Sequence, residues 1–101
     1  MTQKTVITNE YVEVGDKVLL FGRYVEGGKE VFDISKKLAE KGYPGNQNPD
    51  VYAYHGWRGT TNGVAIYAYG VHKVTRVIGT DKIDMDGCML YKVTVGREVN
   101  P

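Results

Sequence analysis

Few side chains in this sequence are of types that carry out catalysis. They are His55, His72, the single cysteine Cys88, and carboxylates such as Asp50. A cysteine beside a histidine can act as a nucleophile, and two histidines with a carboxylate can hold Zn²⁺. However, the chain has no His-x-x-x-His spacing, no Gly-x-Ser-x-Gly and no phosphate-binding glycine loop. We also expect Cys88, which follows a tight turn in an apolar strand, to be a small core residue. We therefore predict no catalytic residue, no metal and no cofactor.

Binding is better supported, because aromatic and basic residues gather between residues 52 and 73. Tyr-Ala-Tyr occurs twice there, and Trp57 and Arg58 lie between the copies. Such side chains can stack nucleic-acid bases and meet phosphates, or can anchor a protein interface. The alternative for each tyrosine is a partly buried core residue with its hydroxyl at the rim. The predicted binding residues are Tyr52, Tyr54, Trp57, Arg58, Tyr67, Tyr69, His72, Lys73 and Arg76.

Length and charge limit the classes of protein that fit. The chain has 101 residues, with 13 basic and 12 acidic side chains and a net charge of +1. This predicts one small β-rich domain over residues 1–101, without the basic excess of an electrostatically driven nucleic-acid binder. A single cysteine excludes an internal disulfide. We find no apolar signal region and no membrane-spanning run, so we expect a cytoplasmic protein that does not contact a membrane.

The first and last segments predict strands and a tail. Residues 4–9 can form a first strand. Residues 13–16, Glu-Val-Gly-Asp, predict a turn into a strand over 17–24 that is apolar on both faces and therefore buried. Residues 96–101 are expected to be a frayed tail.

One helix is expected at about residues 33–41. Asp33 is a suitable N-cap, Ile34 and Leu38 share one face, and Gly42 can end the helix.

The remaining chain predicts strands joined by turns. Residues 43–50 contain two prolines and no aliphatic residue, which predicts an exposed loop. Residues 64–78 form a long apolar run with a bend or bulge at Gly70. Residues 83–95 have the pattern of a hairpin, in which Asp86–Gly87 supplies a tight turn.

Side-chain alternation predicts how the two Tyr-Ala-Tyr copies are used. In each copy the tyrosines point to one face of the strand and the alanine to the other. If the two strands are paired, four tyrosines can share a face, and the alanines lie where a helix packs closely.

Two segments resemble known small barrels. The Gly-Asp turn and following strand in residues 14–20 resemble the opening of SH3- or Tudor-like barrels. Residues 69–78 and 85–93 are similar to the CarD-type module, in which a glycine-containing strand, a Val-x-x-Val/Ile strand, an Asp/Gly turn and a Tyr-x-Val strand follow one another. PUA-like barrels, which bind RNA, also combine a Gly-Asp strand with helical insertions. These resemblances imply binding; for the CarD-type family the partner is RNA polymerase.

We therefore expect an α+β domain: a strongly bent antiparallel β-sheet or small open β-barrel with one short α-helix at about 33–41. The expected function is a non-catalytic binding module, a small intracellular regulator or inhibitor of the kind that phages carry, with a possible homodimer. Near-zero net charge favours a protein partner over nucleic acid. A nucleic-acid-binding barrel with stacked tyrosines is the first alternative, and a small-molecule or enzymatic pocket around His55 and His72 is the second.

Overall fold

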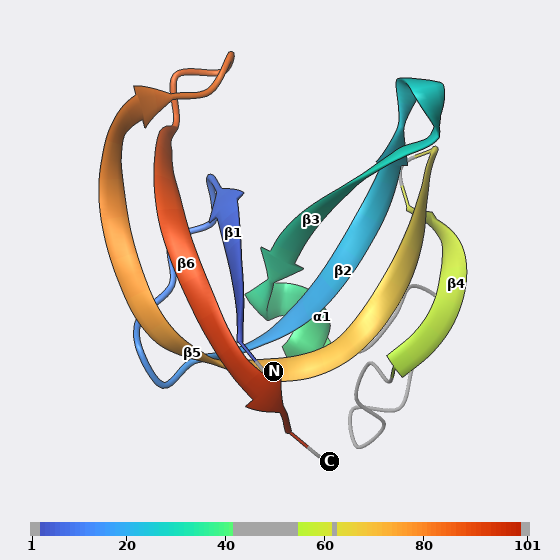
Figure 1. Cartoon of the computed structure of the whole chain (residues 1–101), viewed down its shortest axis with the longest axis horizontal. Coiled ribbons are helices and arrows are strands. Elements are labelled where there is room, and N and C mark those ends of the chain that lie inside the picture. The colour runs from blue at the N-terminus through green and yellow to red at the C-terminus, as the bar shows by residue number, and fades with distance from the viewer. Residues whose placement is uncertain (1–2, 42–54, 62, 100–101) are drawn as a thin grey trace.

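The chain folds into one strongly curled antiparallel sheet that forms a half-barrel (Figure 1). The computed structural model describes residues 3–41, 55–61 and 63–99, and only the backbone of Lys41, His55, Trp57 and Thr61. The elements are β1 (Lys4–Thr8), β2 (Lys17–Val25), the 3-10 turn η1 (Glu26–Gly28), β3 (Lys29–Ser35), α1 (Lys36–Lys41), β4 (His55–Thr61), β5 (Val64–Ile83) and β6 (Met89–Glu98).

The long strand β5 organises the sheet. The strand order is β1-β6-β5-β2-β3, and β4 pairs with β5 beside that path. The first half of β5 therefore lies between β2 and β4, and its second half pairs with β6 (Figure 1). Opposite β2 the register slips: Leu19 faces Val71, but Phe21 faces Ala68. β5 thus has one extra residue here, and Gly70 with φ of 89° lies in this bulge, which confirms the predicted bend.

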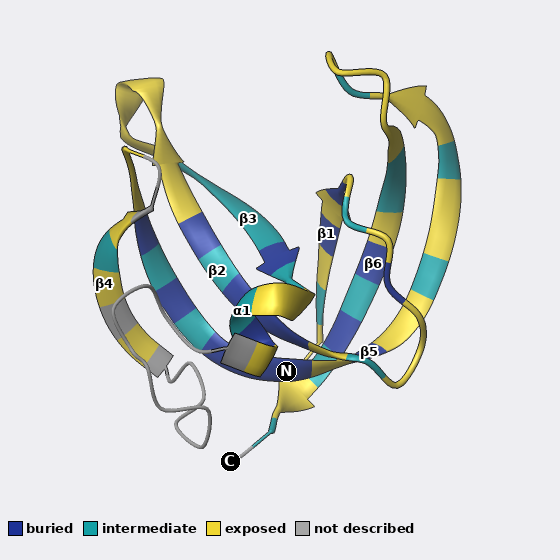
Figure 2. Cartoon of the chain, turned by 180° about the vertical axis from the view of Figure 1, so that it is seen from behind, coloured by how far each residue is buried: buried dark blue, intermediate teal, exposed yellow. Residues whose placement is uncertain are grey.

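The sheet is buried on both faces near its centre, where buried bands follow β2 and β5 (Figure 2). We call the face that carries Val18 and Leu20 the inner face. There these side chains pack with core valines from β1, β5 and β6. We call the other the helix face, because Leu19 and Ala68 pack there against Ala39 of α1. The expected strand over 17–24 is present, but it is buried only in its middle, because Lys17, Arg23 and Tyr24 are exposed. Ala68 faces a helix, as its alternation with the tyrosines predicts.

The helix begins later than the sequence indicated. Asp33 lies in β3, opposite Phe21 of β2, and is not an N-cap. Ile34 belongs to the inner core, whereas Leu38 packs on the helix face, so the two residues do not share a helix face. Pairing with β2 extends the strand through Ser35, and the Oγ of Ser35 accepts a hydrogen bond from the Leu38 amide at 3.2 Å.

The end of the chain also differs from expectation. The β5–β6 connection spans five residues from Asp84 to Cys88 rather than a two-residue Asp-Gly turn. The Oδ1 of Asp84 accepts hydrogen bonds from the amides of Asp86 and Cys88, both at 2.9 Å. Cys88 is exposed here, not a core residue. Residues 96–98 are not a tail but the end of β6, because the sheet ladder continues through them.

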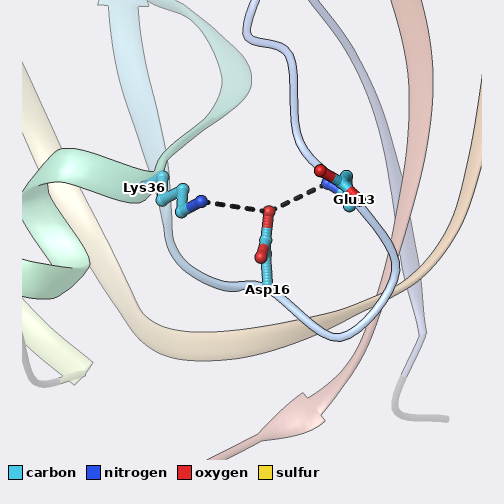
Figure 3. Close-up of polar contacts among 3 residues, drawn as sticks. All are labelled: Glu13, Asp16 and Lys36. Carbon is cyan, nitrogen blue, oxygen red and sulfur yellow. Dashed lines mark hydrogen bonds and ion pairs between the residues drawn. The ribbon is translucent and has the colours of Figure 1, made fainter.

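The predicted turn at residues 13–16 is confirmed, and its aspartate also contacts the helix. The Oδ2 of Asp16 accepts a hydrogen bond from the Glu13 amide at 2.9 Å and lies 3.4 Å from Nζ of Lys36 (Figure 3). Both contacts, and most of all the amide of Glu13, lower the pKa of Asp16. This carboxylate therefore holds the turn before β2 and also makes an ion pair with the first residue of α1.

The predicted fold class is thus correct for the sheet but overstates the helical content. The bent antiparallel sheet, open as a half-barrel, is present. Within the described residues, the helical part is limited to η1 and the six residues of α1, less than the term α+β implies. The expected loop at 43–50 lies outside the described residues.

Candidate functional site

Aromatic rings gather on the inner face where β2, β3 and β5 meet. The Tyr69 ring lies 5.5 Å from that of Phe32 and 4.9 Å from that of Tyr67, measured between ring centroids. Both separations are in the range of favourable aromatic pairs. Tyr69 and Phe32 also pack against the core of the inner face, which holds these two rings in place.

A partly buried hydrogen bond holds the centre of this group. The Tyr69 hydroxyl donates to Oε2 of Glu30 at 2.6 Å. Glu30 reaches it because its side chain crosses Gly22, where a Cβ atom would collide with the carboxylate. Burial first, and then the hydrogen bond to Glu30, raise the pKa of Tyr69 well above its usual range. The hydroxyl therefore stays a neutral donor, suited to a structural role.

Arg58 covers the outer end of the group. Its guanidinium carbon lies 5.4 Å from the centroid of the Tyr67 ring, within cation–π range. A bulge in β4 produces this placement: His55 faces Tyr69 and Arg58 faces Tyr67, so two residues of β4 oppose one of β5. Gly56, with φ of 98°, adopts the left-handed conformation within this bulge.

Beside Arg58 the surface is hollowed. An open cavity of about 300 Å³ is lined by Tyr24, Arg58, Gly59, Ala65, Ile66 and Tyr67. Tyr24, near the end of β2, remains 44% exposed. We call the cavity together with the rings of Phe32 and Tyr69 behind it the aromatic site.

A second cation lies at the opposite end of this ring group. Nζ of Lys4 lies 3.4 Å from the centroid of the Phe32 ring. This contact connects β1 to β3, the two ends of the strand order, which are not hydrogen-bonded to each other. It narrows the opening of the half-barrel next to the aromatic site.

The structure brings together three of the nine predicted binding residues: Arg58, Tyr67 and Tyr69. Tyr52 and Tyr54 lie outside the described residues, and only the backbone of Trp57 is described. These three remain predictions.

His72 has a different environment from the other predicted residues. Its side chain is 9% exposed. Its Nδ1 lies 2.9 Å from the carbonyl oxygen of Gly96 and its Nε2 3.0 Å from that of Tyr69. The imidazole therefore connects β5 to β6 and adds little to any surface.

Lys73 and Arg76 project from the other side of the sheet. The bulge at Gly70 reverses the alternation along β5, so Val71 packs on the helix face although Tyr69 lies on the inner face. Lys73, two residues after Val71, follows it to the helix face. Arg76 is exposed beside the inner-facing Val77. The cations that were expected to accompany the tyrosines are thus separated from them by the sheet.

Sequence reasoning missed Tyr24, Glu30 and Phe32. Tyr24 faces Glu30 and Gly22 faces Phe32 across the β2–β3 hairpin. The available signal was Gly27–Gly28, a two-glycine turn between alternating residues, which indicates a hairpin. Assigning a helix from Asp33 onward hid the second strand of that hairpin.

The described residues contain no group of three or more His, Cys, Asp or Glu side chains arranged to hold a metal ion. Within the same residues, no helix is long and apolar enough to cross a membrane.

Comparison with protein-family models, curated proteins and solved structures finds no match to this chain.

Proposed function

We propose that this protein is a non-catalytic binding module, which takes a segment of a protein partner into its aromatic site. One observation carries the proposal: an open cavity of about 300 Å³ in which the exposed Tyr24 and the Arg58–Tyr67 pair meet. Tyrosine and arginine are the residue types that most often dominate the energy of protein interfaces. The Tyr69 ring behind the cavity is already held by its hydrogen bond to Glu30 and packs against Tyr67, which lowers the cost of ordering these two rings on binding.

The chemistry of the site indicates the kind of segment. Tyr24, Ala65 and Tyr67 offer apolar contact, and Arg58 offers a charged donor at the edge. A segment with an apolar or aromatic side chain next to a carboxylate matches both. A regulator or inhibitor that covers a surface of its target is the role that such a module would have.

Nucleic acid fits the aromatic site less well. Backbone phosphates need a row of cations beside the stacking rings, but Lys73 lies on the helix face and Glu30 adds a carboxyl group among the rings. The net charge of +1 provides no general attraction either.

The test compares proteins captured from lysate by the wild type and by matched tyrosine variants. Tyr24→Ala alters the aromatic site. Tyr11→Ala removes a tyrosine that is also exposed but makes an edge-to-face contact with Tyr91 of β6. We expect a partner that is retained by the wild type and Tyr11→Ala but lost with Tyr24→Ala and Arg58→Ala. With that partner purified, each site variant should weaken binding at least about tenfold, as for an interface hot spot. Equal binding by Tyr24→Ala and the wild type would contradict the proposal.

A second measurement separates the nucleic-acid alternative. Titration of a mixed single-stranded oligonucleotide is followed by the fluorescence of Trp57, the only tryptophan, at low and high salt. We expect no change that depends on Tyr24. A salt-sensitive signal that Tyr24→Ala abolishes would assign the aromatic site to nucleic acid instead.

A further inference from the structure

A second hollow, separate from the aromatic site, gathers positive charge where β2, β5 and β6 meet. It measures about 560 Å³ and is lined by Gln3, Lys17, Lys73, Thr75, Gly96, Arg97 and Val99. We call it the basic hollow. Among the described residues that line it there is no carboxylate.

Strand pairing forces the two lysines together. Lys17 and Lys73 are direct partners in the antiparallel β2–β5 ladder. Lys17 alternates with the inner-facing Val18, so both lysines project from the helix face. Like charges directly opposite each other in a sheet are destabilising. The fold therefore holds an unfavourable pair in place at this position.

A bulge in β6 places Arg97 in the same hollow as the two lysines. His72 faces Glu98 and Val74 faces Val95, so β6 has one residue more than β5 between these pairs. Gly96 keeps the floor of the hollow open, since a Cβ there would lie 3.2 Å from Cγ2 of Thr75. The Gln3 amide adds a donor without charge, whereas the Thr75 hydroxyl already donates to the carbonyl oxygen of Thr94 at 3.2 Å.

Nearby carboxylates are committed to other contacts. Asp16 precedes Lys17 in the sequence, but its Oδ2 is held by the Glu13 amide and Lys36 (Figure 3). Glu98 follows Arg97, but its carboxyl group lies over Gly70. Within the described part of the chain, the single ion pair is Lys36–Asp16. The charges of Lys17, Lys73 and Arg97 are therefore not neutralised by a described carboxylate.

We propose that the basic hollow binds adjacent phosphate groups. Two ammonium groups and a guanidinium supply the charge and the charge-assisted donors that phosphate oxygens prefer. A bound polyanion would also relieve the repulsion between Lys17 and Lys73. The volume of about 560 Å³ exceeds what a single phosphate needs and accommodates a short chain of them. The described lining residues include no aromatic side chain, so they offer contacts to phosphates and no ring on which a base would stack.

Phosphates of this kind occur in free polyphosphates, including nucleoside triphosphates, and in a nucleic-acid backbone. Three probes separate these sources: inorganic tripolyphosphate, adenosine triphosphate and a single-stranded oligothymidine. Binding is measured by calorimetry and by amide chemical shifts at low salt. Similar affinity for the first two and weaker affinity for the third assigns a small ligand. Tighter binding of the oligonucleotide, falling steeply with salt, assigns a nucleic-acid strand.

Variants tie any binding to this position. We expect Lys73→Gln and Arg97→Gln each to weaken binding about tenfold or more, because each removes a charge-assisted contact. Lys82→Gln, which makes the same change at another exposed position of β5, should leave affinity unchanged. In the absence of ligand, Lys73→Gln should raise the unfolding midpoint, since it removes the repulsion with Lys17. A raised unfolding midpoint would show that Lys73→Gln is folded, so its loss of binding would not be caused by unfolding.

The proposal is overturned if none of the three probes binds at low salt. It is also overturned if Lys73→Gln and Lys82→Gln reduce affinity equally. The basic hollow and the aromatic site have no residue in common, so either proposal can fail while the other stands.

Discussion

The hydroxyl of Tyr69 on β5 donates a hydrogen bond of 2.6 Å to Oε2 of Glu30 on β3. The two strands are not neighbours in the sheet, because β2 lies between them. The side chain of Glu30 passes over Gly22 of β2 to make this contact. The bond therefore connects β3 to β5 across β2, and it contributes to the raised pKa of Tyr69.

Replacing Tyr69 by phenylalanine should destabilise the fold. The ring stays, but the carboxyl group of Glu30 loses its donor, at a cost of about 1–3 kcal/mol. Urea unfolding at pH 8 measures this difference. Equal free energies of unfolding for the two proteins would show that the bond contributes nothing.

Alkaline pH should remove the stabilisation that the Tyr69–Glu30 hydrogen bond gives the wild type over Tyr69→Phe. Because the pKa of Tyr69 is raised in the folded state, the unfolded chain releases this proton first, near pH 10. The stabilisation is thus fully present below about pH 10 and declines as pH rises further. The free energy of unfolding of the wild type should approach that of Tyr69→Phe between about pH 10 and 11. The comparison with the variant cancels the other tyrosines, and a constant difference over that range would contradict the expectation.

Asp16 should matter chiefly through its turn and only slightly through its ion pair. Asp16→Ala removes the acceptor for the Glu13 amide and should cost about 1 kcal/mol. Lys36 is 46% exposed, so Lys36→Ala should cost no more than about 0.5 kcal/mol. Asp16→Asn retains an acceptor for the amide and should behave like Lys36→Ala. A double-mutant cycle measures the coupling, and a coupling above about 1 kcal/mol would show that the ion pair dominates.

Local sequence signals predicted the elements that local chemistry determines. The turn before Asp16 and the bend at Gly70 follow from residue types that favour those conformations. The start of the helix does not follow from local residue types, because pairing between Phe21 and Asp33 keeps the chain extended until Ser35. That pairing is a contact between strands, which the local pattern near Asp33 cannot reveal.

The candidate site was predicted in part for a similar reason. Tyr67, Tyr69 and Lys73 are spaced by even numbers, so a regular strand would place them on one face. The extra residue at Gly70 moves Lys73 to the opposite face, where it meets Lys17 instead. A glycine in a strand indicates a bulge, but its effect on register depends on the partner strand. The predicted binding residues are therefore divided between the two faces of the sheet.

Ala68 tests the close packing of α1 on the sheet. It is fully buried against Leu19 and Ala39. Ala68→Leu overfills this contact and should cost about 1–3 kcal/mol. Ala65→Leu, at an exposed position of the same strand, should change the free energy of unfolding by less than about 0.5 kcal/mol. Denaturant titration compares the two, and similar values would mean that the helix does not restrict position 68.

The bulge that separates the two sites can be tested with two glycines of the same strand. Gly70→Ala places a Cβ at a φ of 89° and against the carboxyl group of Glu98. The backbone term alone costs about 1–2 kcal/mol, and displacement of Glu98 adds to it. At Gly79 no atom lies within 4 Å of the added Cβ and φ is not in the left-handed region. Gly79→Ala should therefore be neutral or stabilising by about 0.4–1 kcal/mol. Denaturant unfolding of both variants measures the difference. Equal changes in the free energy of unfolding for the two variants would contradict the bulge at Gly70. Lys73 would then lie on the same face of the sheet as the tyrosines.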